Sequence, residues 1–188
     1  MQPATRWRRS AAPPTPAVAT RSRPAWCSAT SRRRTVPVTD RWEIEHLKYR
    51  YASCVDTRDW DGLAATLAPE MVARYRADLA TEGADALVAE LRSRLTEHRI
   101  TLHQLQHPVI EVEGDRARAT WTMVDRTLCT DLGLVVEGAS LSTDTYRRDP
   151  ERGWLITRID YRRLYESRAP LPEGFTLVTS PFDAVTGL

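Results

Sequence analysis

Cysteine, glycine and lysine are scarce in this chain of 188 residues, and it has no long apolar run. Its cysteines (Cys27, Cys54 and Cys129) are widely spaced, and none lies near a second cysteine or a histidine in a zinc pattern. This argues against a disulfide framework or a structural metal site. The eight glycines are scattered and form no phosphate-binding loop. No segment is apolar enough to suggest a membrane span. We therefore expect a cytoplasmic protein without metal or cofactor.

Acidic residues are missing from positions 1–39, which contain eight arginines. The formal net charge of +2 therefore combines a segment of charge +8 with a remainder of charge −6, in which 25 acidic residues face 19 basic ones. Because the main part of the chain is acidic, the basic total does not indicate a nucleic-acid-binding domain.

Residues 1–37 also hold six of the twelve prolines, and their aliphatic residues are almost all alanine. Such a segment buries too little apolar surface to offset the entropy of ordering, so we expect it to be disordered. Three prolines interrupt residues 11–20, which argues against a secretory or twin-arginine signal. A transit peptide, a nucleic-acid-binding arm and a translated leader remain open. The leader is favoured because 26 arginines against one lysine indicate GC-rich coding, with Val36 or Val38 as the true start.

Apolar residues recur at helical spacing between Asp40 and residue 97. Asp40 and Glu43 stand three apart, as in a capping box that begins a helix. The predicted helices cover residues 40 to 56–59, 60–67 and 84–97, with a short strand over 71–75. The buried face of the first helix is expected to contain Ile44, Leu47, Tyr51, Cys54 and Val55.

After residue 99 the apolar pattern has the period of two that is typical of strands. The predicted strands cover residues 100–113, 116 onward, 134–148 and 154–165, with a hairpin turn at 113–116. Pro108 could interrupt the first of these strands and make His107 a loop or bulge residue. Helices followed by antiparallel strands predict an α+β fold with a pocket between the helices and a curved sheet.

The expected organisation is a disordered segment at 1–37, an α+β barrel domain at 38–168 and an irregular tail at 169–188. The tail could dock on the domain through Phe175, Leu177 and Phe182.

Two candidate site residues break the apolar pattern of the strands. Asp125 shares its strand face with Trp121 and Met123, and a carboxylate there is costly unless it is paired or faces a wet cavity. The alternative is that the strand has already reached solvent at Asp125. His103 lies on the first long strand, on the same face as Thr101, Leu105 and Val109, where a lone histidine is most often a hydrogen-bonded structural residue.

Two further candidates lie at the end of the first helix. Tyr51 belongs to its buried face. Asp56 opposes the negative end of the helix dipole, so its position needs a reason. It could cap the following helix, a role for which Asp59 and Asp61 compete.

Three stretches of the chain resemble the SnoaL-like branch of the nuclear transport factor 2-like superfamily. They are YASCVDTRDWDGLAATLAPE (Tyr51–Glu70), TLHQLQHPVIEVEGDRARATWTMVDRTL (Thr101–Leu128) and ERGWLITRIDYRRLYE (Glu151–Glu166), and the similarity extends over residues 40–166. The Tyr-Ala-x-x-x-Asp-x-x-Asp-Trp opening and the Thr-x-His strand are the more specific motifs. The resemblance implies a cone-shaped, strongly bent antiparallel sheet closed by N-terminal helices around a pocket.

The members with this opening include scytalone dehydratase-like and bile-acid dehydratase-like enzymes. The resemblance implies that His103 and Asp56 form an acid–base pair, with Tyr51 and Asp125 as further catalytic residues. A pocket lined by Trp121 and Met123 would suit a polycyclic or polyketide-like molecule of secondary metabolism. No metal or other cofactor is implied.

The expected activity is a cofactor-independent β-elimination, most simply a dehydration, in which His103 takes a proton from carbon beside a carbonyl. An isomerase or cyclase would use the same step, and a non-catalytic ligand-binding module is the alternative of a different class. Epoxide hydrolysis would need an Asp–Arg–Asp arrangement that the sequence does not reveal. The expected partners are a small-molecule substrate and further copies of the chain in a homodimer or homotrimer, with no nucleic acid and no membrane.

Overall fold

The computed structural model describes residues 38–76 and 79–182. The expectation of disorder over 1–37 lies outside the described residues. The helices are α1 (Val38–Thr57), α2 (Trp60–Ala65) and α3 (Ala84–Arg94). The strands are β1 (Leu67–Arg76), β2 (Leu79–Glu82), β3 (Arg99–Glu113), β4 (Arg116–Cys129), β5 (Leu134–Asp149) and β6 (Gly153–Pro170).

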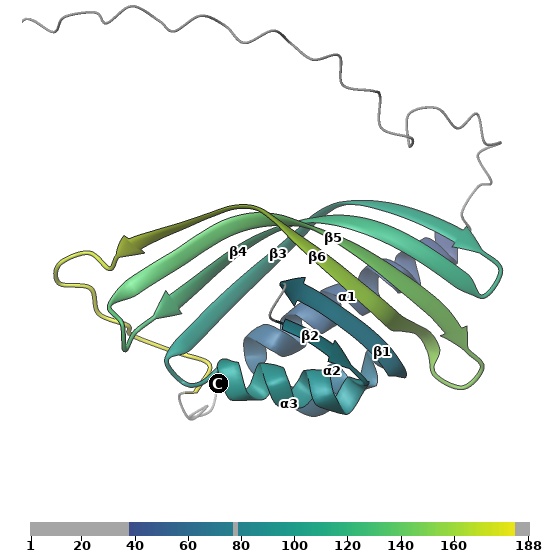
Figure 1. The fold of residues 1–188 in the computed structure, drawn as a ribbon, viewed down its shortest axis with the longest axis horizontal. Helices are drawn as coiled ribbons and strands as arrows, with labels where there is room; N and C mark the ends of the chain where they lie inside the picture. The colour runs from purple at the N-terminus through teal and green to yellow at the C-terminus, as the bar shows by residue number, and fades with distance from the viewer. Residues whose placement is uncertain (1–37, 77–78, 183–188) are drawn as a thin grey trace, which may run out of the picture. The chain divides into compact units, whose positions relative to one another are not determined.

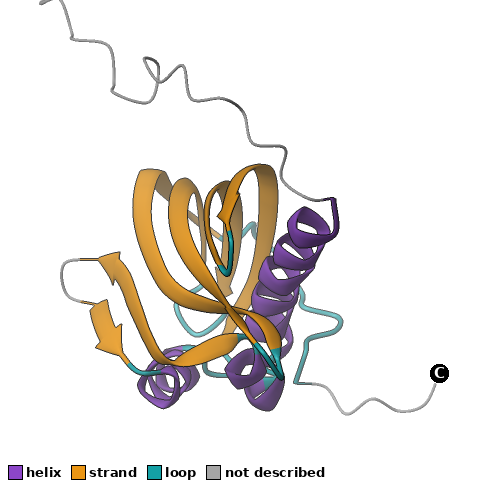
Figure 2. Ribbon diagram, turned by 90° about the vertical axis from the view of Figure 1, so that its right-hand side faces the viewer, coloured by secondary structure: helices purple, strands orange, loops and turns teal. Residues whose placement is uncertain are grey.

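The six strands form one strongly bent sheet in the order β2-β1-β6-β5-β4-β3 (Figure 1). All three helices lie on its concave side, and the side view shows the long strands curling beside α1 (Figure 2). The predicted α+β class with helices against one face of a bent sheet is confirmed. The sheet is mixed rather than wholly antiparallel, because β1 pairs with β6 in parallel. That pairing joins segments far apart in the chain, so no local pattern could reveal it.

Helix α1 lies across the concave face with its apolar side against the sheet. Asp40 is in the first turn of the helix, which begins at Val38, and it pairs with Arg148 of β5. Leu47 is only half-buried, whereas Lys48 joins the buried face although the sequence analysis did not include it. The buried residues are Ile44, Lys48, Tyr51, Ala52, Cys54 and Val55.

The junction between α1 and α2 settles which aspartate caps the second helix. Asp59 is the N-cap residue, and its Oδ1 accepts a hydrogen bond from the backbone N–H of Gly62 at 2.8 Å. Helix α2 ends at Ala65, so the chain has already entered β1 when it reaches Pro69. Because Asp59 caps α2, Asp56 is available for contacts with the sheet.

The β1 region extends beyond the predicted segment 71–75, and the short strand β2 was not predicted at all. Strand β6 is also longer than predicted and ends at Pro170, so the irregular tail begins after it. In the tail, Phe182 lies beneath the guanidinium of Arg58, 5.7 Å from its ring centroid.

Strand β3 contains a bulge at the place where Pro108 was expected to disturb it. The register to β4 shifts between Gln106 and Val109, and His107 has a positive φ of 50°. Odd-numbered residues such as His103 face the helices before the bulge, and even-numbered residues face them after it. Val109 is therefore 64% exposed while Ile110 is buried. The grouping of Val109 with His103 on one face was therefore wrong, and the extra residue in the bulge is the reason.

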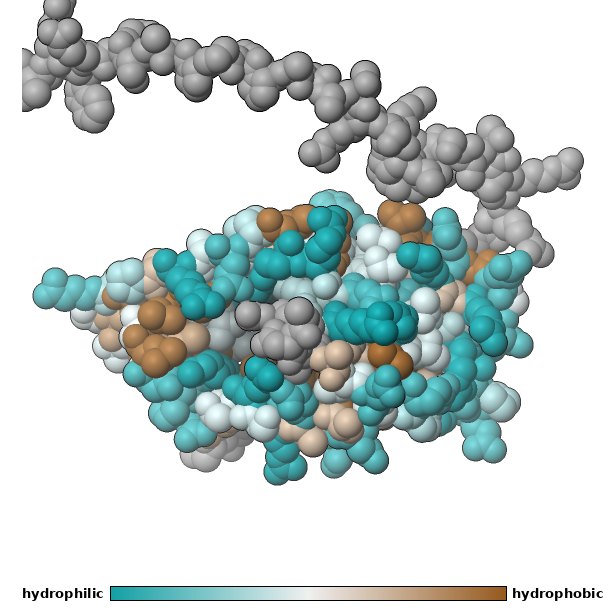
Figure 3. All heavy atoms as spheres, viewed as in Figure 1, coloured by the Kyte–Doolittle hydropathy of each residue, from teal (hydrophilic) through white to brown (hydrophobic). Residues whose placement is uncertain are grey.

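The core fills the concave side between the helices and the sheet. Its largest fully buried side chains include Trp121, Tyr146, Ile44, Leu63, Leu67 and Met71. Outside it, hydrophilic residues dominate the face of the described part shown in Figure 3. The apolar side chains are thus concentrated between the helices and the concave face of the sheet.

Candidate active site

The structure brings His103 and Asp56 into direct contact. Asp56, near the end of α1, places Oδ1 2.6 Å from Nδ1 of the His103 imidazole. Its Oδ2 accepts the backbone N–H of His103 at 2.8 Å, and the hydroxyl of Thr101 donates to Oδ1 at 2.8 Å. The two side chains are 22% and 15% exposed, so the pair is shielded but within reach of solvent.

The end of α1 is fixed against β3 by Arg58, a site residue that was not predicted from the sequence. Arg58 takes the left-handed conformation, with φ of 62°, that commonly follows the last helical residue and usually favours glycine. Its guanidinium donates to the carbonyls of Val55 and Arg99 and, at 3.2 Å, to the hydroxyl of Thr101. One side chain thus ties the helix end to the strand that carries His103.

The surroundings of Asp56 favour its ionised form. Burial raises the pKa of this carboxyl, but the hydrogen bonds and charge of His103 and the hydroxyl of Thr101 outweigh burial and lower it overall. An ionised carboxylate at Nδ1 calls for the proton on that nitrogen. The other nitrogen, Nε2, is then the one able to accept a proton from a substrate.

Asp125 lies directly opposite His103 in the β3–β4 register, so both side chains belong to the concave face. It is only 6% exposed, so the strand has not reached solvent at this position. The guanidinium of Arg163 on β6 binds Asp125 and also contacts Glu166 at 3.3 Å. An ion-paired carboxylate fits a residue that holds Arg163 better than one that delivers a proton.

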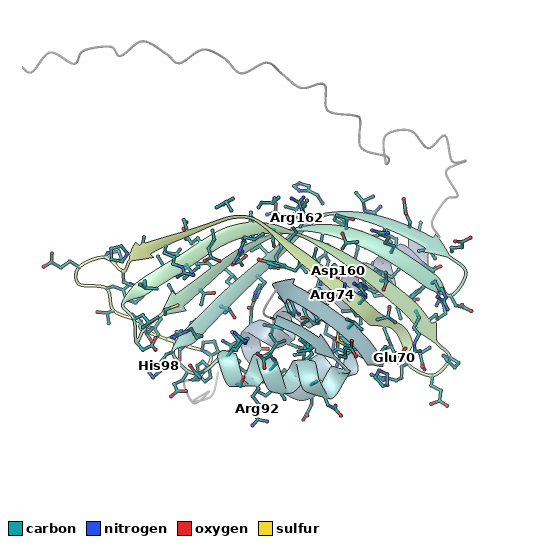
Figure 4. All side chains as sticks on the ribbon, in the orientation of Figure 1. Glu70, Arg74, Arg92, His98, Asp160 and Arg162 are labelled. Carbon is teal, nitrogen blue, oxygen red and sulfur yellow. The ribbon has the colours of Figure 1, made fainter. Side chains whose placement is uncertain are left out.

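The close approach of Gly138 to this ion pair explains why a glycine stands there. Gly138 is the β5 partner of Asp125, and a Cβ at this position would lie 2.7 Å from Nη1 of Arg163 and 2.6 Å from the carbonyl oxygen of Tyr165. Neighbouring Arg162 points to the convex side in Figure 4, as expected from the alternation along β6.

Tyr51 joins a row of aromatic hydroxyl groups deeper in the cone. Its hydroxyl is hydrogen-bonded to that of Tyr75 on β1. The ring of Tyr75 lies 6.0 Å from that of Tyr161, whose ring faces Arg163 at 5.5 Å. A continuous line of polar side chains therefore runs from Arg163 to Tyr51.

Burial is the main cause that raises the pKa of Tyr51 well above its ordinary value, and the neighbouring Tyr75 and the carboxylate of Asp144 add to it. Burial likewise raises the pKa of Tyr75. Both phenols therefore stay protonated at neutral pH, as hydrogen-bond donors must.

The two residues expected to line the substrate pocket occupy different surroundings. Trp121 is fully buried, with its indole N–H donating to the hydroxyl of Tyr146 at 3.0 Å. Met123 is half-buried and pairs in register with Leu105 and Ser140. Trp121 is thus part of the core wall, while Met123 lies beside the His103–Asp125 position.

A hollow of about 320 Å³ lies next to Asp125, but it opens on the convex side. Most of the residues that line it, such as Leu102, Val124 and Arg126, are the strand neighbours of inward-facing residues and so point to the opposite face of the sheet. It is therefore distinct from the pocket expected between helices and sheet.

Within residues 38–76 and 79–182, no three histidine, cysteine, aspartate or glutamate side chains gather as a possible metal site. No helix in that part of the chain is long and apolar enough to span a membrane.

A family-level match covers the part of the chain that contains this site. The model of the SnoaL-like domain matches residues 36–160. The chain belongs to the SnoaL-like family. The match includes α1, all of β3 to β5, and every candidate site residue proposed from the sequence.

Solved structures support the fold of this SnoaL-like protein. A candidate scytalone dehydratase from Novosphingobium aromaticivorans is 20% identical with a TM-score of 0.64, over 74% of this chain and 96% of that one. A hexachlorocyclohexane dehydrochlorinase (LinA) type 2 is 17% identical with a TM-score of 0.64, over 75% and 97%. ActVI-ORFA from Streptomyces coelicolor is 19% identical with a TM-score of 0.57, over 66% and 96%.

Several polar residues of the concave face were not predicted from the sequence. Arg163 and Tyr161 are two residues apart on β6 and therefore lie on the same face of the strand. Asp144 and Tyr146 do the same on β5. Lys48 interrupts the apolar stripe of α1 four residues after Ile44. The available signal was the same one that identified Asp125, namely a charged side chain at a position that the periodicity assigns to the buried face.

Proposed function

We propose that this SnoaL-like protein is a cofactor-independent lyase, a dehydratase that acts on a hydrophobic, polycyclic or polyketide-like small molecule through a His–Asp acid–base pair. The observation that carries the proposal is the 2.6 Å contact between Nδ1 of His103 and Asp56. A carboxylate in this place fixes the tautomer and stabilises the imidazolium that forms on proton transfer.

The reaction begins at carbon next to a substrate carbonyl. Nε2 of His103 takes the proton from that carbon, and the electrons of the broken C–H bond form an enolate. The developing negative charge on oxygen is held by hydrogen bonds from phenol donors, a role that suits the hydroxyls of Tyr51 and Tyr75. The positive charge of the imidazolium is balanced by Asp56.

The second step uses the same histidine as an acid. The enolate electrons form the new C=C bond while the C–O bond to the β-hydroxyl breaks, and the imidazolium supplies its proton to the departing oxygen. One water leaves and His103 returns to its starting form. Because Asp125 is paired with Arg163, we assign it the task of holding that guanidinium in place for substrate.

The names of two similar structures also favour an elimination over the other outcomes of the same proton abstraction. One is a candidate scytalone dehydratase and the other a dehydrochlorinase, and both names denote loss of a small molecule from a substrate. An isomerase or cyclase would share the first step but would return the proton to carbon or join two carbons.

A panel of bicyclic and tricyclic β-hydroxy ketones tests this proposal in D₂O, with product mass and deuterium content as readouts. We expect a product lighter by one water, formed by the wild type and by Asp59→Asn, which retains a good N-cap residue. We expect no such product with His103→Ala or Asp56→Asn.

A product of unchanged mass that contains deuterium would replace the dehydratase by an isomerase or cyclase. Turnover that persists in both variants would contradict the His–Asp pair. Binding of the ketones without deuterium exchange or product would identify a non-catalytic ligand-binding module.

A further inference from the structure

A second pair of charged residues lies deeper in the cone, away from the His103–Asp56 pair. Lys48 of α1 places Nζ 2.7 Å from Oδ2 of Asp144 on β5. The two side chains are only 4% and 0% exposed. Lys48 is the sole lysine of the chain, in a sequence that otherwise uses arginine for its basic residues.

The carboxylate of Asp144 is also held from the strand side. The hydroxyl of Ser142 donates to Oδ1 at 2.5 Å, and the hydroxyl of Tyr146 donates to Oδ2 at 3.0 Å. Tyr146 in turn accepts the indole N–H of Trp121. Asp144 is thus fixed in one position at the centre of a polar network within the core.

Such a pair is not explained by stability. The free-energy cost of removing two charges from water often exceeds the gain from their attraction. Well-packed apolar residues of similar size often stabilise a core equally well or better. A charged pair at this depth therefore suggests a task for its electric field.

The field of the pair acts on Tyr51. Nζ of Lys48 lies 4.7 Å from the centroid of the Tyr51 ring, within the range of a cation–π contact. The negative charge of Asp144 contributes to the raised pKa of Tyr51. Tyr51 in turn is hydrogen-bonded to Tyr75. Lys48 thus contacts Tyr51, and the charge of Asp144 acts on both phenols.

We propose that Lys48 and Asp144 are positioning residues that let the Tyr51–Tyr75 pair hold an anionic oxygen of the substrate, an enolate or phenolate. Lys48 cancels the repulsion that the buried carboxylate of Asp144 would otherwise exert on that oxygen. Asp144 and its hydroxyl partners in turn keep the ammonium of Lys48 beside the Tyr51 ring. This inference rests on the proposed function, because it names the oxygen that those phenols would bind.

The charges predict opposite effects for the two single substitutions. Lys48→Met leaves the carboxylate uncompensated, so an anionic ligand should bind more weakly. Asp144→Asn leaves the ammonium uncompensated, so the same ligand should bind more tightly. Each change should be about tenfold, as expected for unit charges roughly 10 Å apart at an effective dielectric constant of about 20. The double variant should return close to the wild type.

The probe is 4-nitrophenol at a pH where it is ionised, since its phenolate absorbs visible light, and 4-nitroanisole is the neutral counterpart. The affinity of the full chain for each probe is measured by titration, and thermal unfolding checks that each variant is folded. Asp160→Asn, on the outer side of β6, is the matched control, because it changes the net charge equally without touching the network (Figure 4). It should leave both affinities unchanged.

Opposite shifts for the phenolate, with little change for 4-nitroanisole, would support the inference. Shifts in the same direction, equal changes for the neutral probe, or no phenolate binding by the wild type would overturn it. If Lys48→Met does not fold, Asp144→Asn and the double variant still decide the sign. Dehydratase turnover without this phenolate response would refute this inference alone, whereas the response without turnover would refute only the proposed reaction.

Discussion

Replacement of Asp56 by asparagine isolates the charge of the candidate acid–base pair with almost no change in shape. The wild-type carboxylate accepts three hydrogen bonds, from the imidazole and backbone N–H of His103 and from the hydroxyl of Thr101. The amide oxygen of an asparagine can keep the backbone bond. Its NH₂ group would then face Nδ1 and donate to it, which reverses the direction of the contact with the imidazole.

The expected loss of activity has two parts. A hydrogen bond to a charged group is worth about 1.5–3 kcal/mol, which corresponds to a factor of roughly 10–150 in rate if it is fully realised in the transition state. An amide donor at Nδ1 also favours the tautomer whose Nε2 carries the proton and cannot act as a base. Together the two parts should reduce proton abstraction by about 10²–10⁴-fold, the range expected for general-base catalysis.

The assay measures deuterium uptake from D₂O at carbon next to the carbonyl of 1-tetralone, which lacks a β-hydroxyl and so reports the first step alone. Asp59→Asn is the control, because Asp59 lies only three residues further on and caps α2 without touching His103. Exchange by Asp56→Asn within about threefold of wild type, in a protein with unchanged circular dichroism, would show that the carboxylate charge is not needed.

Four further predictions concern stability. In Gly138→Ala the new Cβ would collide with Arg163 and the β6 backbone, so we expect a loss of about 1–3 kcal/mol in urea denaturation, the range for overpacking. Gly114→Ala, at a turn where a Cβ has open space but φ is 58°, should cost about 1–2 kcal/mol. Arg163→Met should lower the thermal midpoint by leaving the buried Asp125 carboxylate unpaired, and Arg163→Met with Asp125→Leu should recover most of the loss. A thermal midpoint no higher in the double variant than in Arg163→Met would contradict this account. The pKa of Asp56 is lower in the folded protein than in the unfolded chain. Its carboxylate therefore makes its full contribution to the free energy of unfolding above about pH 4, and this contribution is lost as the pH falls through the pKa of the folded state. The difference in unfolding free energy between wild type and Asp56→Asn should therefore shrink as the pH falls below about 4. A difference that grows in acid would refute this sign.

Local patterns in the sequence were sufficient for the elements that position His103 and Asp56. The spacing of Ile44 and Tyr51 marked α1, and alternation marked the long strands on either side of the 113–116 hairpin. The α+β class and the SnoaL-like family followed from these patterns and motifs. Even the disturbance at Pro108 was visible, because proline cannot continue a regular ladder.

The rest depends on contacts between segments that lie far apart in the chain. The parallel pairing of β1 with β6 leaves no trace in either strand alone. The ion pair of Asp125 with Arg163, and that of Lys48 with Asp144, each join residues from different elements. Periodicity shows that a charged residue faces inward, but its partner emerges only when the sheet order is known.

The burial of Lys48 gives this SnoaL-like protein a built-in reporter of local opening. Since the sequence contains a single lysine, an amine-reactive reagent has a single ε-amino target, and that target is almost completely enclosed. Modification there requires α1 to separate from β5 before the reagent can reach the nitrogen. The rate of acylation of Lys48 under native conditions would therefore measure how often the cone opens, in the same sense as hydrogen exchange but at one named atom.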